Sequence, residues 1–135
     1  MRALSVRPPW AWAIAHAKKR IENRNWPTSY RGPLAIHASQ RFSSSETAEL
    51  ERILGRKVDP ALFTRGAFIA VVDLVDVVTA DSIEPSPWLC GPYAWLLKSV
   101  RPLSVAVPAT GRLGLWRPTR AQLRAIELSV AARPR

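Results

Sequence analysis

A run of aliphatic and β-branched residues from Gly66 to Val78 constrains the fold of this chain more than any other feature. Branched side chains favour extended backbone because they pack well on a pleated sheet. Asp73 and Asp76 interrupt the run, which is also much shorter than the ~20 apolar residues that a membrane-spanning helix needs. The run therefore excludes a membrane span and predicts a long strand that crosses a small β-barrel with one end exposed.

Three other segments have the composition and termini of helices. Pro9 suits the first turn of an Ala-rich helix, because the missing N–H of proline is not needed there. Ser43 with Glu46, and Thr119 with Gln122, fit capping boxes in which each side chain satisfies a free backbone amide. Helices are therefore expected over residues 9–17, 43–54 and 119–130.

Short strands separated by turn residues occupy the rest of the chain. The expected strands cover residues 3–6, 20–26, 33–38, 66–78, 93–100, 103–107 and 110–116. This order predicts an α+β fold: a small mixed, partly open β-barrel with helices in the connections and a helix at the C-terminus. Residues 1–118 are expected to form the barrel domain, and residues 119–135 a helix and basic tail packed on the same domain.

The charge of the chain points to an anionic partner. Lys and Arg number 20 against 10 Asp and Glu, a formal net charge of +10. A field of this sign attracts phosphate, which favours nucleic acid as a partner. The oligomeric state stays open.

The single cysteine bears on compartment and cofactors. Cys90 cannot form an internal disulfide, and the N-terminal residues lack the apolar run of a signal peptide, so a cytoplasmic location is expected. Cys90 stands alone, and His16 and His37 are far apart in sequence, so no zinc spacing exists. We expect no metal and no cofactor.

Lys19, Glu22 and Arg24 form the first candidate site. Glu22 and Arg24 share a face of the strand over residues 20–26, and the long side chain of Lys19 can reach that face from the preceding turn. Two cations and a carboxylate can bind phosphate, contact base edges or orient a proton. The alternative is a weak surface ion pair.

Aromatic residues and a histidine supply the other candidates. Trp10 can stack on a base, and Trp95 can form a wall opposite it, although both are equally suited to a core. In the strand over residues 33–38, His37 and Ser39 are expected to face away from the core and to supply a hydrogen-bonding edge of the same cleft. A nucleophilic role for this pair has little support, because no acidic residue that could orient the histidine is evident.

Four segments resemble the ASCH (ASC-1 homology) domain family of the PUA-like superfamily. They are residues 4–12 (LSVRPPWAW), 19–26 (KRIENRNW), 30–39 (YRGPLAIHAS) and 111–116 (GRLGLW). The resemblance implies a small β-barrel with a cleft that accepts RNA or a nucleobase. The partner expected on this basis is RNA in preference to DNA, or a nucleoside. The residues expected to contact it are Arg7, Trp10, Lys19, Glu22, Arg24, His37, Ser39 and Trp95.

The resemblance leaves an enzymatic alternative open. Some ASCH proteins hydrolyse the acyl amide of N4-acetylcytidine with a lysine, a threonine and a glutamate, and others cleave RNA. Lys19 matches that lysine, but Glu22 stands where the threonine would be, and no counterpart of the glutamate can be placed. If the chain is an enzyme, Lys19 and Glu22 are the expected catalytic residues. A protein-interaction module is the third possibility, and it predicts an exposed apolar patch.

Overall fold

The computed structural model describes residues 1–132. The expected basic tail at residues 133–135 lies outside the described residues. A single six-stranded sheet forms the centre of the molecule, with strand order β2-β5-β4-β3-β1-β6. The strands are β1 (Arg2–Val6), β2 (Ile21–Arg24), β3 (Gly32–Ala38), β4 (Ala67–Thr79), β5 (Tyr93–Pro108) and β6 (Leu115–Trp116).

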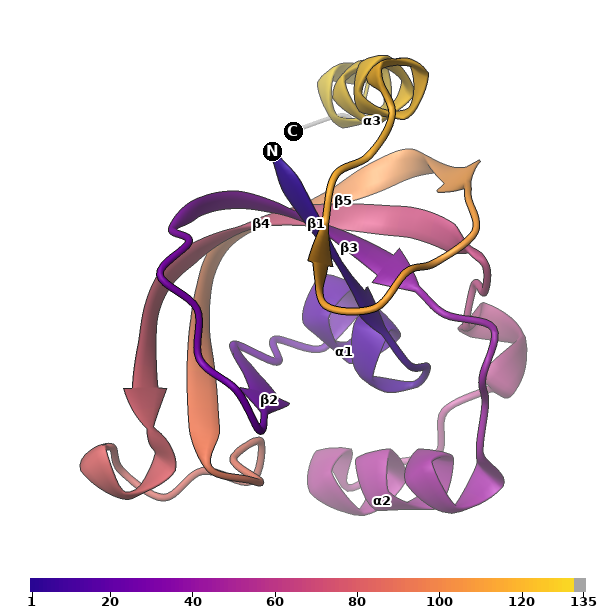
Figure 1. Ribbon diagram of the computed structural model, residues 1–135. Coiled ribbons are helices and arrows are strands. Elements are labelled where there is room, and N and C mark those ends of the chain that lie inside the picture. The colour runs from indigo at the N-terminus through magenta and orange to yellow at the C-terminus, as the bar shows by residue number, and fades with distance from the viewer. Residues whose placement is uncertain (133–135) are drawn as a thin grey trace.

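The sheet is mixed and curved. β1 and β3 are parallel, and the other neighbouring strands are antiparallel. In Figure 1, β4 and β5 bend over so that the sheet forms a half-barrel with α1 on its inner side. The expected mixed, partly open barrel is confirmed.

β5 differs from the expectation of two separate strands. It is one strand that pairs with β4 from Ala67 to Thr79, and Pro102 lies within it opposite Ala70. The register shifts at three places, and Ser99 has a φ of 54°. Such irregularities bend a strand and tolerate a proline that cannot donate to the ladder, which explains why Arg101 and Pro102 do not end the strand.

Three helices surround the sheet: α1 (Trp10–His16), α2 (Ser44–Leu54) and α3 (Arg120–Ala132). Two short 3₁₀ turns, Pro60–Leu62 and Ala80–Ser82, lie in the connections. The capping box at α3 is confirmed by hydrogen bonds of 2.8 and 3.1 Å between Thr119 and Gln122. The box at α2 is wrong: Ser43 makes no side-chain cap, and Glu46 interacts with α1. No helix within residues 1–132 is long and apolar enough to cross a membrane.

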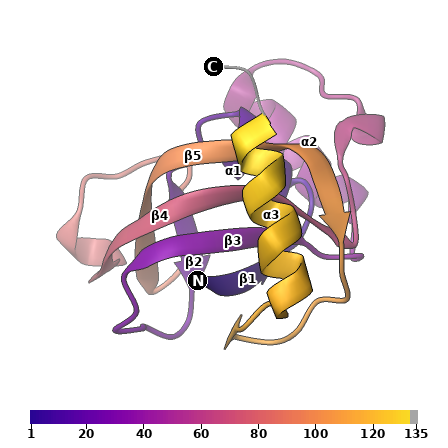
Figure 2. The ribbon, with the colours of Figure 1, turned by 90° about the horizontal axis from the view of Figure 1, so that it is seen from above.

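Each face of the sheet carries a packed core. The inner face packs on α1 through residues such as Leu4 and Ile14. The outer face is covered by α3, with Phe68 and Ile126 in this second core, and Figure 2 shows α3 lying across β3 to β5. A third cluster joins α1 to α2 through residues such as Leu50. Because neither face of β3 is free, a polar residue on β3 can be buried on either side.

Candidate functional site

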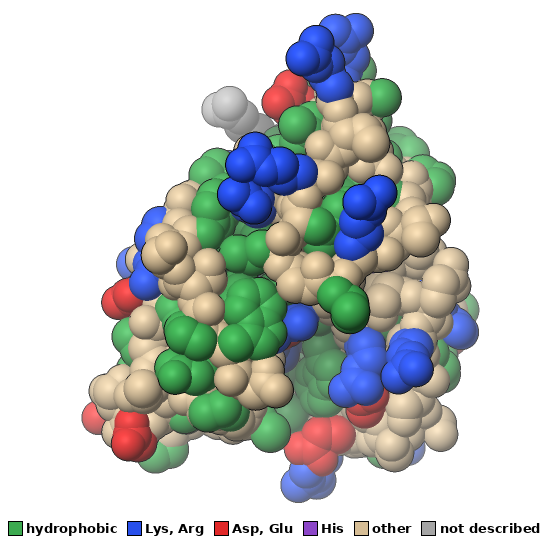
Figure 3. All heavy atoms as spheres, in the orientation of Figure 1, with side chains coloured by type: hydrophobic (Ala, Val, Ile, Leu, Met, Phe, Trp, Pro, Cys, Tyr) green, Lys and Arg blue, Asp and Glu red, His purple; other side chains and the backbone are tan. Residues whose placement is uncertain are grey.

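A cleft of about 710 Å³ opens on the inner side of the half-barrel. Its lining comes from the end of β1, the start of α1, β2, one side of α2 and the loop between Ala80–Ser82 and β5. Figure 3 shows the hollow from the front, with Lys and Arg side chains above it and on one rim, and acidic side chains below. A cleft of this size accommodates a drug-sized ligand.

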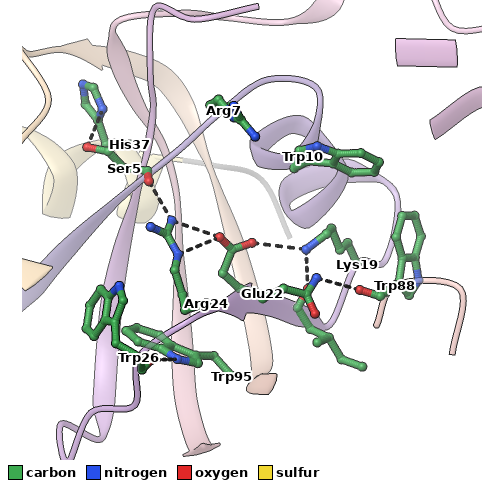
Figure 4. A network of polar contacts seen from close by, with 12 residues as sticks. Ser5, Arg7, Trp10, Lys19, Glu22, Arg24, Trp26, His37, Trp88 and Trp95 are labelled. Carbon is green, nitrogen blue, oxygen red and sulfur yellow. Dashed lines mark hydrogen bonds and ion pairs between the residues drawn. The ribbon is translucent and has the colours of Figure 1, made fainter. Parts of the chain in front are cut away.

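Lys19, Glu22 and Arg24 meet at this cleft. The Lys19 Nζ lies 3.2 Å from Glu22 Oε1, and Arg24 Nε donates to Glu22 Oε2 at 3.0 Å. Figure 4 shows Glu22 between the two cations. The side chains of Lys19 and Glu22 are 4% and 9% exposed, so the carboxylate is compensated inside the protein and not by water. The expectation that the Lys19 side chain reaches the strand face shared by Glu22 and Arg24 is confirmed.

The end of α1 places Lys19 in this position. The chain turns at Lys18, whose φ is 61°, and the backbone N–H of Lys19 donates to the carbonyl of Ala13. The side chain therefore enters the protein, where Nζ also donates to the carbonyl of Ile21. The turn at Lys18 therefore positions Lys19, and β2 positions Glu22 and Arg24.

Arg24 connects the cluster to β1. Its Nη2 donates to the carbonyl of Ser5 at 2.8 Å and lies 2.9 Å from Glu22 Oε2. Arg24 Nη1 makes no hydrogen bond with any residue in the described part of the chain. The guanidinium is held in a fixed orientation and keeps donors available to a ligand.

Three tryptophans line the cleft: Trp10 from α1, Trp26 just after β2, and Trp88 from the loop before β5. The Trp10 indole N–H donates to Glu46 of α2. The Trp26 ring meets the ring of Trp95 edge-on, with centroids 4.9 Å apart. All three cleft tryptophans are half-buried, so each has ring surface left for a ligand.

Asn23 positions the loop that carries Trp88. Its Nδ2 donates to the carbonyl of Trp88 at 2.8 Å, and its Oδ1 accepts from the backbone N–H of Cys90 at 2.7 Å. Both ends of one amide therefore hold one loop. This anchor keeps an aromatic side chain at the cleft although the loop has no regular secondary structure.

Comparison with known proteins identifies the family. The model of the ASCH domain family matches residues 4–103. The chain belongs to the ASCH domain family. The crystal structure of ASCH from Zymomonas mobilis has the same fold, with a TM-score of 0.59, 13% sequence identity and coverage of 94% of this chain and 93% of that chain.

Two curated relatives also contain a matching segment. Activating signal cointegrator 1 from Homo sapiens is 31% identical over 125 residues, which covers 84% of this chain and 22% of the human protein. The same protein from Mus musculus is 30% identical over the same length and coverage. The chain spans about a fifth of the length of these relatives.

Two expectations about this ASCH domain are wrong. Trp95 is fully buried in the inner core, where its indole N–H donates to the carbonyl of Trp26, so Trp26 forms the wall that Trp95 was expected to form. His37 and Ser39 do not line the cleft with Trp10; they line a second hollow on the other side of Ser5. His37 is 1% exposed and packs against aromatic rings of the outer core.

Arg7 lies on the rim of the cleft, and sequence reasoning missed its partner. Arg7 Nη2 is 3.5 Å from Glu46 Oε2, so Glu46 contacts both Arg7 and Trp10. In the sequence, Glu46 had been assigned to a capping box with Ser43, so its contacts with Arg7 and Trp10 were not expected.

Trp26 and Trp88 were also missed as cleft residues. A tryptophan beside prolines in a loop is a usable signal, because a rigid loop can hold an exposed ring. Within residues 1–132 no cluster of His, Cys, Asp or Glu could hold a metal.

Proposed function

We propose that this ASCH domain binds single-stranded RNA by enclosing one unstacked base in the tryptophan-lined cleft. The observation that carries the proposal is the combination of Trp10, Trp26 and Trp88 around a buried, charge-compensated hydrogen-bonding group. Bases of single strands are recognised by stacking on aromatic rings and by hydrogen bonds to their edges. The general association of ASCH domains with RNA binding and the net charge of +10 support it.

The cleft residues have distinct roles in this proposal. The rings supply stacking surface, which is tolerant of base identity. Lys19 and Arg24 keep unpaired donors, and these are suited to carbonyl oxygens or ring nitrogens at the edge of a base. Glu22 sets the position of both cations and stabilises their charge. Selectivity for one base would come from these donors and not from the rings.

Replacing Trp10 with alanine is expected to weaken RNA binding by about 5- to 150-fold, the loss of one stacking contact. Fluorescence anisotropy with a labelled, random-sequence RNA of eight nucleotides measures the effect. Trp12→Ala is the matched control, because Trp12 lies two positions along the same helix and packs on Phe63 outside the cleft. A loss of affinity that is equal in both variants would refute the role of Trp10.

Binding of a DNA octamer to the wild type, compared with the RNA octamer, tests the preference for RNA.

Hydrolysis of a modified nucleoside or of RNA is the second candidate. The observation that favours it is a buried lysine next to a carboxylate in a cleft. Against it, Lys19 Nζ is already engaged with Glu22 and with the carbonyl of Ile21, and Glu22 stands where the hydrolases have a threonine. Incubation of the protein with N4-acetylcytidine and with labelled RNA tests for hydrolysis. Acetate or shortened RNA that disappears with Lys19→Met would establish the enzyme.

A further inference from the structure

A second hollow of about 780 Å³ lies beside the loop that follows β5. Ser5 and His37 are part of its lining, and the backbone of Gly111 packs directly on them. A Cβ atom at Gly111 would lie 2.8 Å from His37 Cε1 and 2.9 Å from Ser5 Oγ, closer than normal contact. The absence of a side chain therefore lets this loop approach the sheet and shape the hollow.

The two hollows differ in charge. The first cleft is lined by Arg7, Lys19 and Arg24 and also by three carboxylates, so its formal charge is zero. The carboxylates are Glu22, Glu46 and Glu49. The second hollow is lined by Arg41 and Arg112 and by no Asp or Glu. A neutral base suits the first environment, whereas a phosphate is attracted to the second.

The two arginines of the second hollow are available to a ligand. Both are exposed, and neither makes a hydrogen bond or an ion pair with another of the 132 described residues. Ser39 also lines this hollow, and its hydroxyl oxygen is buried without a partner among those residues. A buried hydroxyl is normally paired, and rotation of the Ser39 side chain about χ1 would be needed to bring this one to a phosphate oxygen, which is an acceptor.

Ser5 joins the two hollows. Its carbonyl accepts from Arg24 in the first, and its hydroxyl lies 3.2 Å from His37 Nδ1 in the second. Figure 4 shows Ser5 between Arg24 and His37. Ser5 is the residue that the linings of both hollows share, so the two hollows are neighbours on the molecule.

We infer that the second hollow binds the phosphodiester backbone next to the base held in the cleft, through Arg41, Arg112 and the Ser39 hydroxyl. The inference rests on the proposed function and names its ligand as an oligonucleotide and not a free nucleoside. The salt dependence of RNA binding should then arise at the second hollow, because phosphate contacts release counterions whereas stacking does not.

The test compares the double variant R41Q/R112Q with R120Q/R124Q, which loses two exposed arginines from α3 and so has the same net charge. Binding of a labelled RNA octamer is measured by anisotropy between 50 and 300 mM salt. We expect R41Q/R112Q to bind on the order of tenfold more weakly at low salt, with the slope of log K against log salt reduced by about 0.7 for each lost phosphate contact. R120Q/R124Q should retain the wild-type slope.

A second arm separates this inference from the proposed function. Binding of ribonucleosides, which carry no phosphate, is followed by tryptophan fluorescence in the wild type, R41Q/R112Q and Trp10→Ala. We expect R41Q/R112Q to leave nucleoside binding unchanged and Trp10→Ala to reduce it. Equal RNA affinities and slopes in the two double variants, or a wild type that binds no RNA, would overturn the inference. An unchanged Trp10→Ala beside a weakened R41Q/R112Q would overturn the base cleft alone.

Discussion

Glu22→Gln is expected to lower the free energy of unfolding by about 3–5 kcal/mol, because it leaves two cations inside the protein without their counter-charge. Lys19 is 4% exposed and Arg24 is 22% exposed as side chains, so water would replace the carboxylate only in part. Natural domains have only about 5–15 kcal/mol of stability, and the variant should therefore unfold at a much lower urea concentration. Urea denaturation followed by circular dichroism measures the change.

Glu127→Gln is the control for this change. Glu127 is exposed on α3, so the same chemical substitution there should alter stability by less than about 0.5 kcal/mol. Lys19→Met should cost less than Glu22→Gln, because Glu22 keeps Arg24 as a partner. If Glu22→Gln were as stable as Glu127→Gln, the buried cluster would not exist as described.

Trp95→Ala is expected to destabilise the domain by about 3–5 kcal/mol, the cost of deleting a large core side chain and leaving a cavity. Trp95 is fully buried, and the substitution also removes its hydrogen bond to Trp26. Trp88→Ala should have the opposite profile. It lies half-buried on a loop and packs only at the edge of the core between α1 and α2, so its loss should cost less stability than that of Trp95 and a large part of the RNA affinity.

Thermal unfolding and RNA anisotropy on the two variants test this contrast. Both measurements are made below the unfolding transition of Trp95→Ala, so that affinity is read from folded protein. A Trp95→Ala variant that is as stable as the wild type but binds RNA more weakly would show that Trp95 lines the cleft and is not part of the core. A Trp88→Ala variant that unfolds early would make that residue part of the core.

The charged cluster could be predicted from the sequence because its geometry is local. Glu22 and Arg24 are two apart on one strand, and alternation alone puts them on one face. Lys19 needs only a long side chain and a turn between the helix and the strand. The capping box at Thr119 is equally local. At Ser43 the same pattern failed, because Glu46 found a tertiary partner in Trp10.

The positions of His37 and Trp95 could not be predicted, because alternation distinguishes two faces of a strand but not which face is exposed. Both faces of this sheet are covered, the inner one by α1 and the outer one by α3. Trp88 depends on a loop that Asn23 holds from 65 positions away. Contacts of this range leave no periodic signal in the sequence.

The most direct test of the base cleft follows the indole N–H resonances of the six tryptophans by NMR while RNA octamers of each single base are added. We expect ring-current shifts at Trp10, Trp26 and Trp88, which line the cleft, and unmoved resonances for Trp12 and Trp116, which do not. Single Trp→Phe variants assign the peaks. RNA binding that leaves the three cleft indoles unmoved would contradict the binding of a base in this cleft.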